Sequence, residues 1–223
     1  MIELKKVSFS YGDRKLLDKV DLALSPGSFH FLTGPSGAGK TTFMKLCYID
    51  LLPEAGALEV FEKDVASLKR DDIARTRQRI GVVHQDCQFL DHLSIVENIA
   101  LPLSVSGREA DPKDMSELLG WVGLTDRAKA KPPELSGGER QRAALARAVM
   151  MDPDIILADE PTGNIDWEMS LKLLTLLIEL NKMGKSVLLA THDLGLIRAA
   201  KPEISARVLR LKDAGLTLAG ADL

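Results

Sequence analysis

The sequence has only two cysteines, Cys47 and Cys87, and neither CxxC nor metal-type spacing surrounds them. We therefore interpret both as reduced, structural thiols in the interior of a cytoplasmic protein. Long apolar runs are also missing. No stretch approaches the roughly 18 to 20 residues of a membrane-spanning helix, and the opening MIELKKVSFSY lacks the apolar segment of a secretion signal. If this protein acts at a membrane, we expect another chain to span it.

A surplus of basic charge is absent as well, because the formal net charge is −3. Without an overall basic field, we expect no nucleic acid partner. The chain has 223 residues, of which 45% are apolar and 27% are charged, as in a globular protein that forms one domain, or one domain with a smaller lobe attached. No internal repeat, low-complexity tract or long linker divides it.

Short β-type runs open the chain. VSFSY, VDLAL and SFHFLTG are separated by the turn residues GDRK and SPG, which predicts a small antiparallel sheet leading into a core strand. Three later runs, IGVVHQ, DIILADE and SVLLATHD, are rich in Val, Ile and Leu, as in parallel strands buried on both faces. Residues 111–150 have helical patterns only, and ARVLRLKDAGLTLAG is typical of a hairpin turned at Asp213 to Gly215.

These patterns predict an α/β fold that forms one domain over residues 1–223. Its core lobe, about residues 1–85 and 151–223, has a mostly parallel sheet and an N-terminal antiparallel β subdomain. Its helical lobe, about residues 86–150, is inserted between two core strands.

Residues 34–41, GPSGAGKT, match the phosphate-loop pattern G-x-x-x-x-G-K-[ST] between a predicted strand and a predicted helix. Glycines let backbone N–H groups turn toward phosphate oxygens, and the helix adds the positive end of its dipole. Lys40 is expected to reach the β- and γ-phosphates, and the Thr41 hydroxyl to bind Mg²⁺. The alternative, a glycine-rich turn with an incidental lysine, explains fewer of the fixed positions. The predicted nucleotide-binding residues here are Gly34, Pro35, Ser36, Gly37, Ala38, Gly39, Lys40, Thr41 and Thr42.

Two adjacent carboxylates, Asp159 and Glu160, follow the apolar run of DIILADE, at the edge where α/β sheets bind ligands. Neighbouring strand residues point to opposite faces, so we expect different roles for the two. Asp159 would hold Mg²⁺, and Glu160 would activate the water that attacks the γ-phosphate. The alternative is a pair of solvated acids that close a strand.

Three further candidates depend on these motifs for their interpretation. His192 follows the strand SVLLAT and is predicted to sense the γ-phosphate, although a lone histidine is more often a surface or core residue. Gln85 ends another apolar run, and its amide is suited to hold Mg²⁺ or the attacking water. Tyr11 is equally well read as an aromatic that stacks on adenine or as a core residue.

A second glycine loop, LSGG at 135–138, precedes a predicted helix. Ser136 is suited to cap this helix, while Gly137 and Gly138 expose backbone N–H groups at its positive end. A capped helix start explains Ser136 but not the two glycines. The chain thus has one complete phosphate site and a second anion site with no ligand of its own. This combination predicts that two copies join head to tail, so that the second glycine loop of each copy covers the nucleotide of the other.

Five motifs follow one another along the chain: Gly34–Thr41, Gln85, LSGGE at 135–139, IILADE at 155–160 and His192. Their order and spacing resemble those of ABC-type ATPase subunits over essentially the whole chain. The resemblance implies a P-loop NTPase core of the ABC ATPase fold, ATP and Mg²⁺ as ligands, and a homodimer that closes on ATP and opens on hydrolysis. It adds Glu139 and Asp166 to the nucleotide-binding residues. It also implies a separate integral membrane subunit and a peripheral location on the cytoplasmic face of the cell membrane.

Within the family, PTGNID at 161–166 is similar to the loop of ATPases that serve lipoprotein release, macrolide efflux and cell division. The stretches VASLKRDDIARTRQRIGVVHQD and FLDHLSIVENIALPL are most similar to the cell-division group, although His84 stands where those relatives usually carry phenylalanine. An ATPase of lipoprotein release or efflux is the alternative. ABC ATPases of DNA repair or translation would show coiled coils or tandem units, and a scaffold without turnover is disfavoured by Glu160 and His192.

Four apolar residues after Gln85 are candidates for contact with the membrane subunit. Phe89 and Leu90 are predicted to lie at a surface groove that accepts a short cytoplasmic helix, whereas Leu93 and Ile95 also suit packing under the helical lobe. The basic residues Lys69, Arg70, Arg75, Arg77 and Arg79 fit a membrane-facing surface less well than a solvated helix face.

Overall fold

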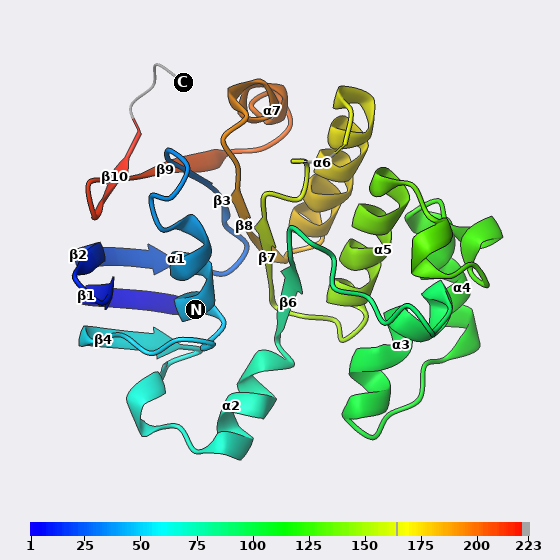
Figure 1. The fold of residues 1–223 in the computed structure, drawn as a ribbon, viewed down its shortest axis with the longest axis horizontal. Coiled ribbons are helices and arrows are strands. Elements are labelled where there is room, and N and C mark those ends of the chain that lie inside the picture. The colour runs from blue at the N-terminus through cyan, green and yellow to red at the C-terminus, as the bar shows by residue number, and fades with distance from the viewer. Residues whose placement is uncertain (164, 220–223) are drawn as a thin grey trace.

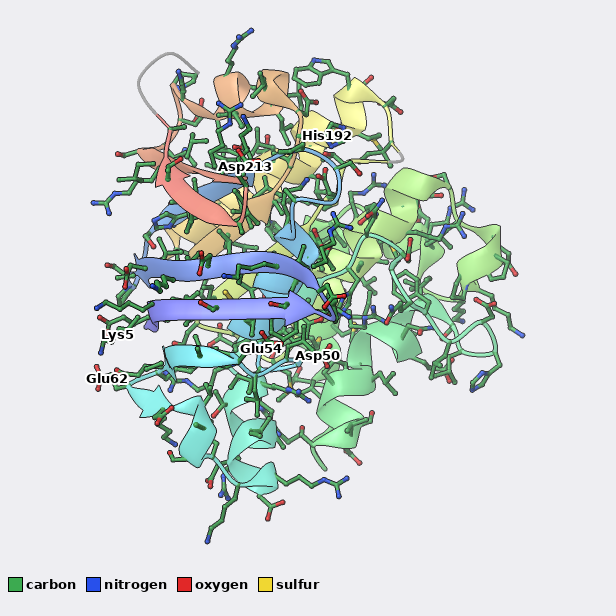
Figure 2. All side chains as sticks on the ribbon, turned by 60° about the vertical axis from the view of Figure 1, so that its left-hand side comes forward. Lys5, Asp50, Glu54, Glu62, His192 and Asp213 are labelled. Carbon is green, nitrogen blue, oxygen red and sulfur yellow. The ribbon has the colours of Figure 1, made fainter. Side chains whose placement is uncertain are left out.

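A computed structural model describes residues 1–163 and 165–219 and contains two β-sheets. The smaller sheet has the order β2-β1-β4-β5 and consists of β1 (Ile2–Tyr11), β2 (Arg14–Leu24), β4 (Ala55–Val60) and β5 (Lys63–Asp64). Its neighbours are antiparallel, which confirms the predicted N-terminal subdomain. Figure 2 shows Asp50 and Glu54 near the end of β1 that carries Tyr11, whereas Lys5 and Glu62 lie at the opposite end of this sheet.

The larger sheet has the order β10-β9-β3-β8-β7-β6. It consists of β3 (Phe29–Thr33), β6 (Ile80–Val83), β7 (Ile155–Asp159), β8 (Ser186–Ala190), β9 (Ala206–Lys212) and β10 (Gly215–Leu218). All its pairs are parallel except the terminal β9–β10 hairpin. Every residue of β3, β7 and β8 is buried, as expected for apolar strands covered on both faces, so the predicted mostly parallel core sheet is confirmed.

Seven α-helices belong to the described residues: α1 (Lys40–Cys47), α2 (Arg70–Arg77), α3 (Ile95–Val105), α4 (Pro112–Trp121), α5 (Gly137–Val149), α6 (Trp167–Lys182) and α7 (Leu194–Ala200). Three short 3-10 helices lie at Val65–Ser67, Thr125–Arg127 and Pro132–Glu134. In Figure 1, α1 lies between the two sheets, and α5 and α6 cover the other face of the large sheet. Helices α3, α4 and α5 occur between the paired strands β6 and β7 and form a separate helical group, which agrees with the predicted inserted lobe.

Two buried apolar clusters hold these layers together. One lies between the sheets and includes Phe43 and Met44 of α1, and the other joins the large sheet to α3, α4, α5 and α6. Cys47 and Cys87 are buried and unpaired, as expected. Within the described residues, no helix is both long enough and apolar enough to cross a membrane.

The parallel register brings the carboxyl ends of β3, β6, β7 and β8 to one edge of the large sheet (Figure 1). The glycine loop follows β3, Gln85 follows β6, Glu160 follows β7 and His192 follows β8. Four motifs that are far apart in the sequence therefore meet at this edge, where α/β folds bind ligands.

Candidate functional site

A cavity of about 630 Å³ lies at this edge of the sheet. Its walls come from the end of β1, the loop before α1 and the residues that follow β6, β7 and β8. The lining residues are Tyr11, Arg14, Leu16, Gly34, Pro35, Ser36, Gly37, Gly39, Lys40, Thr41, Thr42, Gln85, Asp159, Glu160, Gly163 and His192. Most residues predicted to bind nucleotide or to act in catalysis therefore face one space.

The loop before α1 depends on glycine at two positions. Gly34 has φ +155°, and a Cβ atom there would lie 2.3 Å from the carbonyl oxygen of Leu211. Gly39 precedes the first helical residue in a left-handed conformation, with φ 104°. These positions bring the backbone of the loop around the end of α1, where N–H groups and the helix dipole attract anions.

Lys40 stands at the centre of the cavity wall. Its Nζ donates to the carbonyl oxygen of Gly34 at 3.0 Å and lies 3.3 Å from Oε1 of Glu160. The other carboxylate oxygen of Glu160, Oε2, is 2.9 Å from Nδ1 of His192. Glu160 therefore bridges the phosphate-loop lysine and the histidine after β8. This arrangement leaves both the lysine and the carboxylate next to the open cavity.

Asp159 is the last residue of β7, and its Oδ1 is buried with no hydrogen-bond partner among the described residues. Burial raises the pKa of Asp159, while a hydrogen bond with Thr41 and the charge of Lys40 act in the opposite direction. The described residues contain no group of three or more His, Cys, Asp or Glu side chains arranged to hold a metal ion by themselves. A buried carboxylate oxygen without a partner, beside a hydroxyl and the amide of Gln85, nevertheless fits Mg²⁺, which prefers few protein oxygens plus phosphates and water.

The second glycine loop lies outside this cavity. Ser136 caps α5: its Oγ accepts from the backbone N–H of Glu139, and the Glu139 carboxylate accepts from the backbone N–H of Ser136 at 2.8 Å. Glu139 also accepts from Arg127 at 2.9 Å, and these hydrogen bonds, first that from the Ser136 backbone, lower its pKa. Ser136 itself remains exposed.

The structure gives a packing reason for one glycine of this loop. A Cβ atom on Gly138 would lie 3.2 Å from the side chain of Met169 in α6, which is tighter than ordinary contact. Asp166 caps α6 by accepting from the backbone N–H of Met169 at 2.9 Å, and it does not line the cavity. The half-buried Ala38 is likewise outside the cavity lining.

Sequence reasoning missed Arg14, the first residue of β2, which also lines the cavity. Its Nη2 donates to the carbonyl oxygen of Gly37 at 2.7 Å and so ties the antiparallel sheet to the phosphate loop. The available signal was a cation three residues after Tyr11. Tyr11 itself is 51% exposed and contacts Phe9 edge to face, so it belongs to the cavity wall rather than to the core.

A second cavity, of about 570 Å³, lies between α2, β6, α3 and α5, and we call it the α2–α3 groove. It is lined by Ala74, Arg77, Gln78, Ile80, Gly81, Val82, His84, Gln88, Leu101, Pro102, Val105, Ser106, Arg147, Ala148 and Met151. Figure 1 shows α2 and α3 on either side of β6. His84 lines this groove, and the next residue, Gln85, lines the first cavity. The two cavities are therefore connected by consecutive residues of the chain.

The residues predicted to form a surface groove do not line this one. Phe89 is half-buried beneath the guanidinium of Arg147, whose Cζ is 4.6 Å from the ring centroid, and it packs against the core of the helical group. Leu90 is 41% exposed but lies outside the lining, and Ile95 is fully buried. A short apolar run does not reveal which of its side chains the neighbouring helix α5 covers.

Residues 17–163 match the ABC transporter family, and the chain belongs to that family. The predicted ABC-type ATPase is thereby confirmed at the level of fold and enzyme class. The chain is 42% identical to the cell division ATP-binding protein FtsE of Escherichia coli K12 over 220 residues, covering 97% of each chain. It is 39% identical to FtsE of Bacillus subtilis over 209 residues, covering 92% of each chain.

Two solved structures of similar fold are dimeric. The dimeric post-hydrolysis state of the ATP-binding cassette MJ0796, bound to ADP and Pi, is 33% identical with a TM-score of 0.86, covering 97% of this chain and 96% of that one. A further dimeric structure of MJ0796, a bacterial ABC transporter cassette, is 34% identical with the same TM-score and coverage.

Proposed function

We propose that this protein is the ATP-hydrolysing subunit of a cell-division complex and works with a separate membrane subunit of the FtsX type. The observation that carries the proposal is the contact of Glu160 with both Lys40 and His192 at the cavity that also holds Asp159. The similarity to proteins named for cell division favours this role over lipoprotein release or efflux. The location would be the cytoplasmic face of the cell membrane.

Glu160 is proposed as the base that takes a proton from the attacking water, with His192 orienting the carboxylate through the 2.9 Å contact. Lys40 would bind the β- and γ-phosphates, and the backbone of the loop before α1 would bind the remaining phosphate oxygens. Tyr11 would stack on the adenine.

Thr41, Gln85 and Asp159 would hold Mg²⁺, and the bound ion would neutralise negative charge on the phosphates. Gln85 would also position the attacking water. This set is supported by the unpartnered buried oxygen of Asp159 and by the joint exposure of all three residues to one cavity.

The second nucleotide contact would come from another copy of the chain. The nucleotide cavity of one copy is lined by none of Ser136, Gly137, Gly138, Glu139 and Asp166. This supports a head-to-tail homodimer in which Ser136 contacts the γ-phosphate of the ATP bound to the other copy. The core lobe, about residues 1–85 and 151–223, and the helical lobe, about residues 86–150, would close together on ATP.

The α2–α3 groove is the proposed docking site for a cytoplasmic segment of the membrane subunit. Val105 of α3 is 81% exposed and lines this groove, so it offers an apolar anchor beside the loop that carries Gln85. A partner bound here would respond to the position of that loop.

The test is co-purification from detergent extracts with the division membrane subunit, followed by rescue of division in cells. Val105→Asp should abolish both while ATP binding by the isolated chain stays at the wild-type level, because Val105 does not line the nucleotide cavity. Leu218→Asp, at a 67% exposed residue of β10, is the matched control. Wild-type yield of the membrane subunit with Val105→Asp would place docking elsewhere.

A further inference from the structure

The charges in the α2–α3 groove are of one sign. Arg77 and Arg147 line it together with His84, whose pKa burial lowers, and no Asp or Glu is among the described lining residues. Its other walls are largely apolar, with Leu101, Pro102, Val105 and Met151 contributing side chains. A segment that fills this groove therefore meets apolar surface and at least one arginine together.

Arg147 has a fixed position in the groove. Its Nη1 donates to the carbonyl oxygen of Gln88 at 2.9 Å, its Nη2 donates to that of Cys87 at 2.5 Å, and its guanidinium stacks over Phe89. These contacts use two of the five N–H donors of the side chain. The remaining donors are held in place beside an open cavity.

Arg147 also lacks an acidic partner in the part of the chain that the structure describes. The arginines nearby differ in this respect: Arg77 lies 4.0 Å from Asp50, and Arg79 is 2.7 Å from Asp154. Burial lowers the pKa of Arg147, although a guanidinium stays charged at any physiological pH. A half-buried cation without a counter-charge gains more from a carboxylate than an exposed one does.

We infer that the α2–α3 groove receives an amphipathic segment of the membrane subunit whose aspartate or glutamate pairs with Arg147 while apolar side chains contact Leu101 and Val105. The inference rests on the proposed docking function and specifies its chemistry. The two oxygens of a carboxylate can accept from two of the three remaining N–H donors of Arg147, which fixes the register of the segment in the groove.

A folded segment fits this site better than an anionic membrane surface does. Arg147 is half-buried in a concave space between α2 and α3, and a flat bilayer fits a concave space less well than a segment that fills it. On the outside of α2, Arg75 is already paired with Asp72 at 2.8 Å. The exposed Val105 at the rim then contacts the apolar face of the same segment.

The first experiment measures binding of the detergent-solubilised membrane subunit to Arg147→Met, which keeps an apolar stem over Phe89 but removes the charge. Affinity should fall by about 30-fold or more, as for loss of one member of a buried charge pair. Arg79→Met, which removes an arginine outside the groove, is the matched control and should lose less than about fivefold. Thermal unfolding and ATP affinity of both variants report whether they fold.

The second experiment identifies the acidic residue by charge exchange. Arg147→Glu is combined with membrane subunits in which each cytoplasmic Asp or Glu is replaced in turn by Lys, and one replacement should restore binding. If none restores it, or if folded Arg147→Met binds within fivefold of wild type, the inference is wrong. Loss of binding to anionic vesicles with unchanged binding of the membrane subunit would also overturn it.

Val105→Asp separates this inference from the docking proposal itself. If Val105→Asp binds normally, the groove is not the docking site and both fail. If Val105→Asp abolishes binding while Arg147→Met does not change it, docking in the groove stands and only the acidic contact is wrong.

Discussion

Replacing Glu160 with glutamine should change hydrolysis and ATP affinity in opposite directions. The amide keeps the size of the side chain and its hydrogen bond with His192, but it loses the basic oxygen that would accept a proton from water. Phosphate release should therefore fall by about 10²- to 10⁴-fold, the usual contribution of a positioned general base. The closed dimer should accumulate in ATP because it no longer reopens by hydrolysis.

The gain in affinity follows from the contact between Lys40 and Glu160. Their side chains are 9% and 13% exposed, and the charged atoms are 3.3 Å apart. At an effective dielectric of about 20, the direct attraction at this distance is about 5 kcal/mol. Desolvation of the two largely buried side chains offsets most of this, which leaves a net value of about 1 kcal/mol. Freeing Lys40 for the phosphates should then tighten ATP binding about fivefold.

The assay pairs equilibrium binding of a fluorescent ATP analogue with release of phosphate under single-turnover conditions. Glu179→Gln is the control, because this carboxylate accepts from Trp121 at 2.7 Å far from the cavity lining and an amide oxygen can do the same. Hydrolysis within threefold of wild type would remove Glu160 from the role of base. Unchanged or weaker ATP binding would show that its contact with Lys40 does not compete with phosphate.

Three other substitutions test separate parts of the structure. Lys40→Ala should weaken ATP binding, measured by the same fluorescence assay, because the phosphates lose their fixed cation. Ser136→Arg should leave ATP binding by the monomer intact and block dimer formation in light scattering; an equal loss of affinity in these two variants would contradict a shared site. Gly81→Ala should destabilise the fold by about 1–3 kcal/mol in thermal unfolding, since its Cβ would lie 2.4 Å from the carbonyl oxygen of Ala148, whereas Gly120→Ala, 4.0 Å from its nearest neighbour, should not.

The strands of the large sheet were predictable because burial on both faces leaves an uninterrupted apolar run. Strand β4 was not, although it pairs with β1 over most of its length. Its second residue, Gly56, has φ +85°, and a Cβ there would lie 2.2 Å from the carbonyl oxygen of Lys6. A glycine at the start of a strand lowers its β-propensity, and its close contact with a distant backbone cannot be read from the neighbouring residues, so the local sequence does not indicate the strand.

The cavity residues were predictable where one short motif supplies several of them, as in the loop from Gly34 to Thr41. Arg14 was not, because its position depends on a hairpin folding back onto Gly37. The packing of Gly138 against Met169 likewise depends on where α6 lies. Sequence spacing thus predicts groups that share a loop or a strand end, and long-range packing decides the rest.

Helix α5 physically connects the two cavities and the second glycine loop. Ser136 begins it, and Gln141, on its second turn, donates to the backbone carbonyl of Gln85 at 3.1 Å. About 9 Å further along the axis, Arg147 donates to the carbonyls of Cys87 and Gln88. Most of the helix between these points is buried. In the proposed head-to-tail dimer, a second copy that meets Ser136 through its nucleotide would act on the helix that contacts the residues at 85–88, and a segment seated in the α2–α3 groove would act on the same helix from its other end.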